Sequence, residues 1–288
     1  GSSRIFPAKN AMYCARRAGY DLNLVAEGGL QACSYDLSDF IVFGASNSGQ
    51  TKEVITLFER LNRINHKHLY ALTANKNTKL ESLAKQTFVL NCEKEQAVAA
   101  TKSVAEQGLF YQALLAAATN TSLDKKLHQL ADTFDAALKM PIDPAVTQAI
   151  ANAGTIYFAG RNDGVAEELT LKTNEITRKK SDFLEGTYAV HGIEEVMNAD
   201  DVVILINPFI SELEKIKQTL ADGVGMKVFA VCDQQTIFPT IIVPDIGELS
   251  NYIYLAAGWN ILVEVGVGLN INLDKPQRAR KVGNEFMG

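Results

Sequence analysis

The sequence predicts an α/β protein in which parallel β-sheets are flanked by helices. Short runs rich in branched apolar residues alternate with segments that have the spacing of amphipathic helices. This order of strand, loop and helix occurs twice along the 288 residues. The length corresponds to roughly two domains at about 100–200 residues each. We therefore expect two similar α/β domains.

The first half alternates helix and strand signals and then becomes helical. Pro7–Ala18 is expected to form a helix with proline in its first turn. Strands are expected at Leu22–Ala26, Phe40–Phe43, His68–Leu72 and Thr87–Leu90, and helices at Thr51–Ile64 and Lys79–Lys85. The segment Thr101–Asn152 is helical throughout, with breaks near Asn120–Thr121 and Pro141–Pro144. We interpret it as a helical connector.

The second half repeats this order. Strands are expected at Thr155–Ala159, Val202–Ile206, Lys227–Val231 and Thr240–Val243, and helices at Gly164–Thr177, Ser211–Leu220 and Leu249–Leu269. The tail after Asn270 is polar and contains several basic residues. The expected domains are residues 1–138, with the connector, and residues 139–288, with the tail.

The composition excludes several classes of partner. The net charge is −5 and no block of basic residues stands out, which argues against nucleic acid and anionic membranes. No apolar stretch reaches the roughly 20 residues of a membrane span. The four cysteines are scattered without a C-x-x-C pair, as expected for reduced thiols in a cytoplasmic protein. No residues have metal-ligand spacing, so we expect neither a metal nor another cofactor.

The loop after Phe40–Phe43 has the composition of a phosphate-binding loop. It reads Ser46-Asn47-Ser48-Gly49-Gln50-Thr51, and a helix follows at once. Ligands of α/β proteins bind at the carboxyl ends of parallel strands, and a helix N-terminus offers free N–H groups to an anion. Simple helix capping by Ser48 or Thr51 is the alternative, but a cap needs only one hydroxyl and this loop has three. The loop is neither a Walker A loop nor a dinucleotide-binding turn.

Two further features are candidates for catalysis. Glu168, Lys172 and Glu175 lie at i, i+4 and i+7 and therefore share one helix face. A solvated salt-bridge stripe is the alternative explanation of that spacing. His191 lies 16 residues after Glu175 and is followed by Gly192. A purely structural histidine is the alternative there.

Three motifs together resemble those of the sugar isomerase (SIS) domain proteins, and the resemblance covers essentially the whole chain. The pattern is similar to two-domain members such as the isomerase half of glucosamine-6-phosphate synthase, the amino-sugar phosphate deaminases and the fructosamine-6-phosphate deglycases. The matching segments are Gly1-Ser2-Ser3, Ser46-Asn47-Ser48-Gly49-Gln50-Thr51 and Val98-Ala99-Ala100-Thr101-Lys102. The resemblance implies two SIS domains, each a flavodoxin-like three-layer sandwich.

The resemblance also implies roles for individual residues. The residues matched to phosphate and substrate binding are Ser2, Ser3, Ser46, Asn47, Ser48, Thr51, Val98 and Ala100. Glu175 matches the acid/base that moves a proton between C1 and C2 of the sugar, and Glu168 and Lys172 match its companions. His191 matches a residue that assists ring opening, often in the site of the partner subunit. Lys281, in the tail that begins at Asp274, matches a lysine that can form a Schiff base with the ketose.

The chain departs from the family pattern in two places. Gly1-Ser2-Ser3 matches the turn after the first strand, which implies that the first domain is truncated at its N-terminus in this sequence; a further N-terminal domain, such as a glutaminase, is compatible with that. No proline follows Gly192, and Glu185 lies further upstream of His191 than the family's glutamate. This second departure favours a branch with a different amine substituent over the synthase.

The expected function is therefore an enzyme that acts on a 6-phosphorylated fructosamine or amino sugar by proton transfer between C1 and C2. A deglycase or deaminase that releases the amine and a hexose 6-phosphate is the preferred interpretation. The isomerase domain of a glutamine–fructose-6-phosphate aminotransferase and a simple aldose–ketose isomerase are alternatives, and a non-catalytic phosphosugar sensor is another. The long apolar segment Leu249–Leu269 and the habit of the family favour a homodimer with shared active sites.

Overall fold

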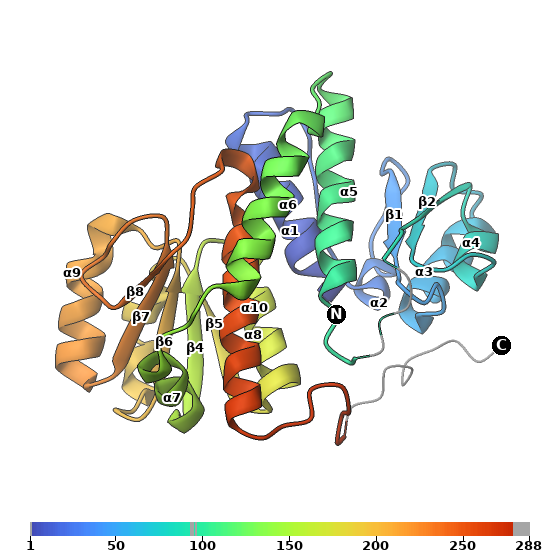
Figure 1. The fold of residues 1–288 in the computed structure, drawn as a ribbon. Coiled ribbons are helices and arrows are strands. Elements are labelled where there is room, and N and C mark those ends of the chain that lie inside the picture. Colours follow the sequence, from blue (N-terminus) through green and yellow to red (C-terminus); the bar gives the residue numbers. More distant parts are fainter. Residues whose placement is uncertain (1, 93–94, 96, 279–288) are drawn as a thin grey trace.

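The computed structural model describes residues 2–92, 95 and 97–278. Within these residues the chain forms two parallel β-sheets, one of three strands and one of five. Figure 1 shows the sheets on opposite sides of the molecule, with a layer of long helices between them. The prediction of an α/β fold with parallel sheets flanked by helices is confirmed. The division into two SIS domains after residue 138 stays a prediction.

The first sheet is built from the N-terminal segment of the chain. Its elements are η1 (Ser2–Arg4, a 3-10 turn), α1 (Phe6–Arg17), α2 (Gly29–Ala32), β1 (Val42–Ala45), α3 (Lys52–Arg63), β2 (Leu69–Thr73), α4 (Lys79–Leu83), β3 (Gln86–Val89) and α5 (Lys102–Ala118). The strands pair in the order β1-β2-β3, with Val42 opposite Leu69 and Tyr70 opposite Gln86. The amphipathic helix α3 covers one face because Ile55, Phe58 and Leu61 are buried there.

The second sheet follows two connecting helices. The elements are α6 (Asp124–Lys139), α7 (Pro144–Asn152), β4 (Thr155–Gly160), α8 (Val165–Lys172), the π-helix η2 (Thr173–Thr177), β5 (Lys180–Glu185), the 3-10 turns η3 (Tyr188–Val190) and η4 (Ile193–Val196), β6 (Val202–Ile206), the 3-10 turn η5 (Ile210–Glu212), α9 (Leu213–Ile216), the π-helix η6 (Lys217–Val224), β7 (Lys227–Cys232), β8 (Thr240–Ile242), the 3-10 turn η7 (Gly247–Leu249) and α10 (Ser250–Gly268). The strand order is β5-β4-β6-β7-β8, so β4 lies between β5 and β6.

Successive residues of the central strand β6 face opposite sides of the second sheet. Ile204 and Ile206 belong to a core cluster shared with α8 and α10, whereas Val203 and Leu205 belong to a cluster shared with α9 and η6. All five residues of β6 are buried, as expected for a strand covered on both faces. The second sheet therefore has the three-layer arrangement that the sequence predicts.

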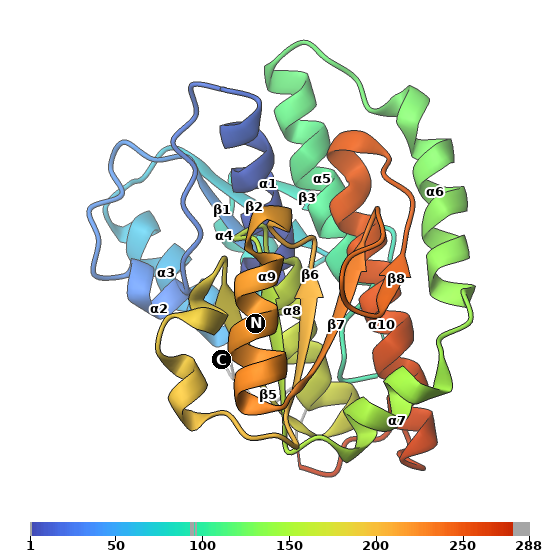
Figure 2. The same ribbon diagram turned by 90° about the vertical axis from the view of Figure 1, so that its left-hand side faces the viewer.

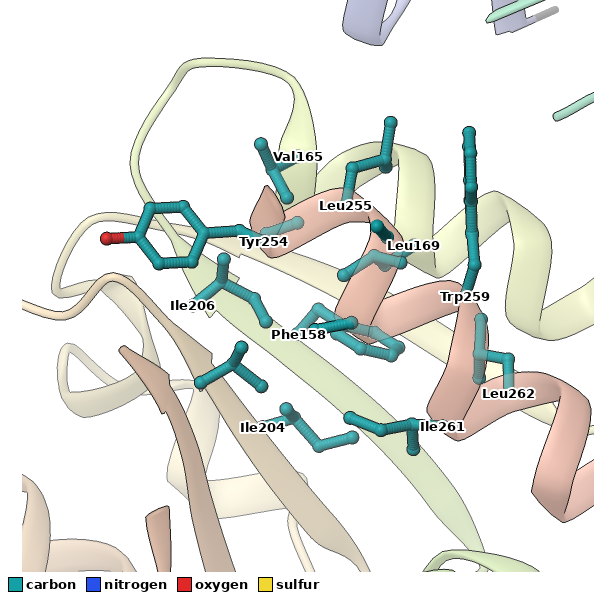
Figure 3. Packing of buried hydrophobic residues seen from close by; sticks show 14 of the residues in the cluster. Phe158, Val165, Leu169, Ile204, Ile206, Tyr254, Leu255, Trp259, Ile261 and Leu262 are labelled. Atoms are coloured by element: carbon teal, nitrogen blue, oxygen red, sulfur yellow. The ribbon is translucent and has the colours of Figure 1, made fainter. Parts of the chain in front are cut away.

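The largest core cluster lies between the second sheet and the helical layer. Figure 3 shows Phe158, Ile204 and Ile206 of the sheet facing side chains of α8 and α10. The helix α10 is buried on almost all sides, since residues 250–262 are all buried. Each large apolar side chain buried here contributes about 1.5–3 kcal/mol relative to an exposed position. This packing explains why apolar residues in the segment Leu249–Leu269 are not confined to one face of the helix.

The helices next to the first sheet belong to the same core. Phe6 of α1 and Val104 of α5 lie in the cluster that contains Leu169 of α8. A salt bridge between Lys9 and Glu167 joins α1 to α8 at the surface of this contact. The two sheets are thus connected through one continuous helical layer, in which α1, α5, α6, α8 and α10 run side by side (Figure 1).

Two local predictions differ from the structure. Leu22–Ala26 was expected as a strand, but it forms none and runs as a loop between α1 and α2. A strand needs a hydrogen-bonded neighbour, and no described strand lies next to this segment. The edge strand β5 was missed, because Lys180, Asp182 and Glu185 give it a polar sequence. The predicted helix Gly164–Thr177 is present, but its last turn is the π-helix η2.

Candidate functional site

The predicted phosphate loop connects β1 to α3 at the carboxyl end of the strand. The hydroxyls of Ser46 and Thr51 are 2.7 Å apart and hydrogen-bonded, and the Gln50 N–H donates to the Ser48 hydroxyl at 3.1 Å. Thr51 is the N-cap residue of α3, but its side chain makes no capping hydrogen bond. Capping therefore does not account for Thr51, and its hydroxyl instead helps to fold the loop.

Gly49 is the tightest point of this loop. It adopts a left-handed conformation with φ of +63°. A Cβ at this position would lie 2.4 Å from the side chain of Thr78. Thr78 is itself fixed by a capping box with Glu81 at the start of α4. Only glycine allows the loop to turn so close to α4.

Asn47 ties the loop to the start of α5. Its side-chain amide donates to the Ser103 hydroxyl at 2.5 Å and accepts from the Gln107 amide at 2.6 Å. Ser103 and Gln107 are both fully buried. Asn47, which is half-buried, therefore positions the loop. Sequence reasoning missed Ser103 and Gln107, because they are 56 and 60 residues away from Asn47 along the chain.

The segment before α5 lies between the loop and the core of the second sheet. The Glu95 carboxylate accepts hydrogen bonds from the backbone N–H groups of Thr101 and Lys102, at 2.8 and 2.9 Å, and also from Ser103. Ala100 is half-buried and packs against the largest core cluster. A carboxylate at a helix N-terminus is favoured by the helix dipole. The start of α5 is thereby fixed as a rigid support beside the loop.

The N-terminal turn reaches the same place. The 3-10 turn η1, which contains Ser2 and Ser3, packs against α5. Val98 is half-buried in the bend that precedes α5. The structure thus gathers the three segments that the sequence singled out, namely η1, the loop and residues 98–102, around the N-terminus of α5.

Glu168, Lys172 and Glu175 form a connected ion cluster. The Lys172 ammonium lies 3.2 Å from a Glu168 oxygen and 2.6 Å from a Glu175 oxygen. The side chains of Glu168 and Lys172 are 0% exposed, whereas that of Glu175 is 22% exposed. A solvated surface stripe is therefore the wrong explanation of their spacing. The π-helix η2 begins directly after Lys172, and π-turns in helices are frequent at functional sites.

This cluster is expensive to bury. Taking a charge out of water costs several kcal/mol, which the attraction between the partners only partly offsets. Buried apolar residues of similar size would often stabilise a helix as well or better. The Glu175 carboxylate is partly exposed and is held by the buried Lys172 ammonium. It therefore has the features of a fixed base that can reach a ligand.

His191 lies elsewhere on the surface. It is exposed, between η3 and η4, and its backbone N–H donates to the Tyr188 carbonyl. No hydrogen bond or ion pair joins its side chain to the cluster of Glu168, Lys172 and Glu175 within the described residues. Gly192 follows with φ of +102°, and its N–H donates to Glu194 at 2.7 Å. The chain thus presents His191 outward on a tight turn.

The tail runs beside the end of η2. The Arg178 guanidinium donates to the carbonyls of Asn272, at 3.1 Å, and Lys275, at 2.8 Å. The described part of the tail is thereby attached three residues after Glu175. Lys281, predicted as a Schiff-base lysine, lies outside the described residues.

One family model matches part of the chain. The SIS domain family model matches residues 34–117. This part of the chain is therefore similar to a SIS domain. It contains the loop 46–51 and the segment 98–102, whereas Glu168, Lys172, Glu175 and His191 lie beyond the matched residues. No curated protein sequence matches the chain.

Solved SIS-type structures share the fold over nearly the whole chain. The C-terminal domain of glucosamine–fructose-6-phosphate aminotransferase from Francisella tularensis has a TM-score of 0.77 at 17% identity, over 96% of this chain and 85% of that one. Glucosamine-6-phosphate deaminase from Thermotoga maritima has a TM-score of 0.77 at 19% identity, over 98% of this chain and 87% of that one. Tagatose-6-phosphate ketose/aldose isomerase from Escherichia coli has a TM-score of 0.77 at 17% identity, over 97% of this chain and 84% of that one. The chain thus has the fold of SIS-type phosphosugar isomerases.

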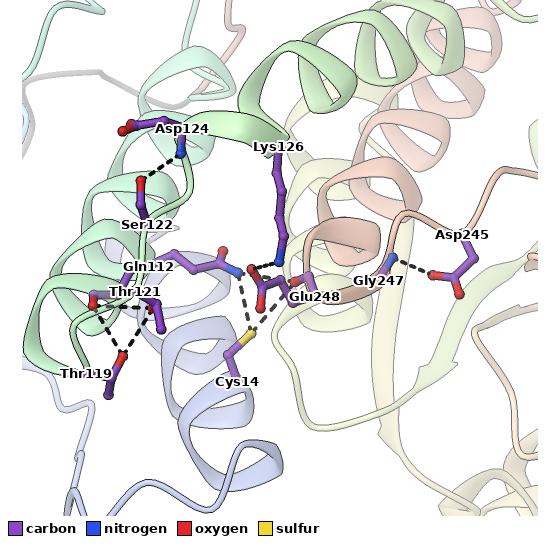
Figure 4. Close-up of polar contacts among 11 residues, drawn as sticks. Cys14, Gln112, Thr119, Thr121, Ser122, Asp124, Lys126, Asp245, Gly247 and Glu248 are labelled. Atoms are coloured by element: carbon purple, nitrogen blue, oxygen red, sulfur yellow. Dashed lines mark hydrogen bonds and ion pairs between the residues drawn. The ribbon is translucent and has the colours of Figure 1, made fainter.

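One cavity is lined by none of the residues of the loop 46–51. It has a volume of about 360 Å³ and is lined by the later turns of α1 and α5 and the residues before α10, Cys14, Gln112 and Glu248 among them. Figure 4 shows how Gln112, Cys14 and Glu248 contact one another there. Burial raises the pKa of the Cys14 thiol to about 11. None of the residues predicted as site residues lines this cavity.

The described residues contain neither a cluster of metal ligands nor a membrane-spanning helix. No group of three or more His, Cys, Asp or Glu side chains there could hold a metal ion. No helix in the same part of the chain is both long and apolar enough to span a membrane.

Proposed function

We propose that this protein is an enzyme that acts on a 6-phosphorylated fructosamine or amino sugar, releasing the amine as a deglycase or deaminase. The observation that carries the proposal is the buried lysine Lys172 between Glu168 and Glu175, of which only Glu175 is partly exposed. Such a cluster is costly for stability and suits a base that must stay ionised and fixed.

The phosphate group would bind in the loop Ser46–Thr51. The hydroxyls of the loop and the N-terminus of α3 offer hydrogen-bond donors to an anion. Asn47, held by Ser103 and Gln107, fixes the loop before a ligand arrives. Little ordering energy is then lost when the phosphate binds. Ser2, Ser3, Val98 and Ala100 would complete the binding site from η1 and the segment before α5.

Glu175 would then move the proton between C1 and C2. For a fructosamine, the carboxylate takes a proton from C1, the C2 carbonyl oxygen gains one, and an enaminol forms. Return of the proton to C2 gives an iminium at C1. Loss of its N–H proton, which balances the one gained by the C2 oxygen, leaves an imine that water hydrolyses to an aldose 6-phosphate and the free amine. Lys172 orients the Glu175 carboxylate through the 2.6 Å contact, and Glu168 holds Lys172 from the other side.

The first turn of α5 supports the idea that loop and cluster serve one site. Ser103 contacts Asn47 of the loop, while its neighbour Val104 lies in the core cluster that contains Leu169 and Ile176. These two residues are the sequence neighbours of Glu168 and Glu175. A sugar phosphate with its phosphate in the loop would extend across this segment toward Glu175.

His191 would act in the site of a partner subunit. It is exposed and separate from the cluster of its own chain, as a residue donated across an interface would be. We propose a homodimer with shared sites, in which two SIS domains, residues 1–138 and 139–288, each contribute. Lys281 would approach the sugar from the tail, whose attachment by Arg178 starts beside η2.

A simple isomerase and an aminotransferase isomerase domain use the same proton transfer and are the alternatives. The structural neighbours are described as an aminotransferase domain, a deaminase and a ketose/aldose isomerase, so the fold admits each reaction. The absence of a proline after Gly192 in the sequence favours amine release, because it changes the turn that presents His191.

The test is a panel of substrates with a matched pair of variants. Purified protein is incubated with fructoselysine 6-phosphate, glucoselysine 6-phosphate, glucosamine 6-phosphate and fructose 6-phosphate, and free amine and hexose phosphates are quantified. Glu175→Gln should reduce turnover at least about 1,000-fold while phosphosugar binding survives. Glu264→Gln, on an exposed position of α10, should change neither. Turnover that survives in Glu175→Gln would remove Glu175 from the mechanism. Binding without turnover in every case would favour a sensor.

A further inference from the structure

The N-terminus of α5 is occupied by a side chain of the same protein. The N-cap residue Thr101 makes no side-chain capping hydrogen bond. Instead, the Glu95 carboxylate accepts from the backbone N–H groups of Thr101 and Lys102, at 2.8 and 2.9 Å. A helix N-terminus would otherwise offer such N–H groups to an anion. The two helices beside the loop Ser46–Thr51 therefore differ, because α3 has no side-chain cap at its N-terminus and α5 already holds a carboxylate there.

A hydrogen-bond relay leads from this carboxylate to the loop. A carboxylate can only accept, and the single proton of the Ser103 hydroxyl is donated to it. The Ser103 oxygen accepts from the Asn47 amide at 2.5 Å, and the Asn47 side-chain oxygen accepts from the Gln107 amide at 2.6 Å. Every bond of the relay thus points toward its one charged member, in the order Gln107, Asn47, Ser103 and Glu95. Because Ser103 and Gln107 are 0% and 1% exposed, water does not replace a missing member.

The relay reaches the residue that anchors the loop. The backbone carbonyl of Asn47 accepts from the Ala74 N–H at 3.1 Å and from the Asn75 side-chain amide at 2.7 Å, both in the segment after β2. Figures 1 and 2 show α5 beside the strands of the first sheet, where Phe110 and Tyr111 pack against a core cluster of that sheet. Asn47 is thus held by its side chain from α5 and by its backbone from the sheet. The hydroxyls at positions 46 and 48 flank it, so their placement depends on where it is held.

We propose that Glu95 is a positioning residue for phosphate binding, which acts through Ser103 and Asn47 without touching the ligand. Its carboxylate sets the donor and acceptor roles along the relay and so fixes the loop in the arrangement that receives the phosphate. It also keeps the N-terminus of α5 from binding a second anion, which leaves the loop and α3 to bind a single phosphate. The inference rests on the phosphate site of the proposed function and is separate from the proton transfer at Glu175.

The test is a double-mutant cycle on ligand binding. Glu95→Ala removes the charged end of the relay, and Ser103→Ala removes the link to Asn47 while Glu95 stays on the N–H groups of α5. Glu106→Ala is the matched control, because the Glu106 carboxylate also accepts a backbone N–H, that of Asn91 at 2.6 Å, and lies on α5 outside the relay. The Kd of glucosamine 6-phosphate is measured by calorimetric titration. KM and kcat are measured with a sugar phosphate that the wild-type protein turns over.

Each relay substitution should weaken binding about tenfold or more, because a hydrogen bond to a charged group contributes about that factor. The double variant should bind no more weakly than the weaker single variant, since both changes interrupt one relay. KM should rise with Kd while kcat stays within about twofold, and Glu106→Ala should bind as the wild type does. Multiplied losses in the double variant, or a fall in kcat with Kd unchanged, would overturn the proposal.

A second measurement needs no ligand. The Gly49 N–H is hydrogen-bonded within the loop, and the Val42 N–H is hydrogen-bonded across the first sheet. Hydrogen exchange at Gly49, followed by NMR, should be at least about tenfold faster in Glu95→Ala and in Ser103→Ala, while Val42 stays protected and reports that β1 is folded. Unchanged exchange at Gly49 in both variants would overturn the positioning role. Should Glu95→Ala lose protection at Val42, Ser103→Ala decides by the same criteria, because its α5 keeps the Glu95 cap.

The two measurements separate the failure of this proposal from the failure of the proposed function. A wild-type protein that binds no sugar phosphate would refute the phosphate site, and exchange at Gly49 would still decide whether Glu95 holds the loop. Wild-type binding that Glu95→Ala and Ser103→Ala both retain would refute the positioning role and leave the phosphate site standing.

Discussion

Replacing Lys172 with methionine tests the buried ion cluster most directly. Lys172 and Glu168 are 0% exposed, with 3.2 Å between the ammonium and the nearer carboxylate oxygen. Methionine has a similar length and no charge, so the substitution leaves the Glu168 carboxylate buried without that cation. Breaking a buried pair from one side costs about 3–5 kcal/mol. The Glu175 side chain is 22% exposed, so water screens its charge. Loss of its contact with Lys172 therefore contributes at most about 1 kcal/mol to the destabilisation. We therefore expect Lys172→Met to lower the free energy of unfolding by about 3–5 kcal/mol.

A double-mutant cycle separates this charge effect from lost packing. Glu168→Gln alone keeps the shape and leaves Lys172 paired with Glu175, so it should cost less than Lys172→Met. In the double variant the carboxylate charge at position 168 is removed together with the cation that faces it. It should be about 1–3 kcal/mol more stable than the sum of the single changes predicts. Urea unfolding followed by circular dichroism measures all four free energies. Additivity within about 0.5 kcal/mol would refute the view that the two buried charges depend on each other.

Two further predictions concern the loops at the carboxyl ends of the strands. Burial raises the pKa of Asp163 from 3.8 to about 6, so its ionisation opposes folding above pH 6 and not below pH 4. In Asp163→Asn the side-chain oxygen can still accept the hydrogen bond from the Val165 N–H. The substitution should stabilise the protein by up to about 3 kcal/mol at pH 8 and by little at pH 4. An equal rise in melting temperature at both pH values would contradict this. Gly49→Ala places a Cβ 2.4 Å from the side chain of Thr78, at a residue with φ of +63°. We expect it to lower the free energy of unfolding by about 2 kcal/mol. Calorimetric titration should show at least about tenfold weaker binding of glucosamine 6-phosphate. Gly19→Ala, at φ of +70° with open space around it, is the control for backbone strain and should spare binding.

Several features of the site could be predicted from the sequence because they are local. The hydroxyl-rich loop, its glycine and the helix that follows are contiguous, and their chemistry can be recognised without knowing what packs against them. The spacing of Glu168, Lys172 and Glu175 places them on one helix face. Spacing could not show that Lys172 is fully buried, since burial depends on the packing of α8 against α10 and the sheet.

The residues that sequence reasoning missed act across long separations. Ser103 and Gln107 hold Asn47 from a helix that begins 51 residues after the loop ends, and no local pattern connects them. The prediction for Leu22–Ala26 failed for a related reason. Its composition, rich in branched apolar residues, is that of a strand, but strand formation requires backbone partners on a neighbouring strand. In β5 those partners exist along β4, and a polar segment became a strand.

The sequence by itself determined the class of fold, most of its helices and strands and the character of the phosphate loop, because hydrophobic periodicity and turn chemistry act over a few residues. The tertiary structure alone decided which of these parts meet. It buries Lys172, places Asn47 against α5, gathers η1, the loop and residues 98–102 at one helix N-terminus, and leaves His191 exposed. These outcomes depend on contacts between segments far apart in the chain, whose energies come from desolvation and close packing, and no pattern within one segment specifies them.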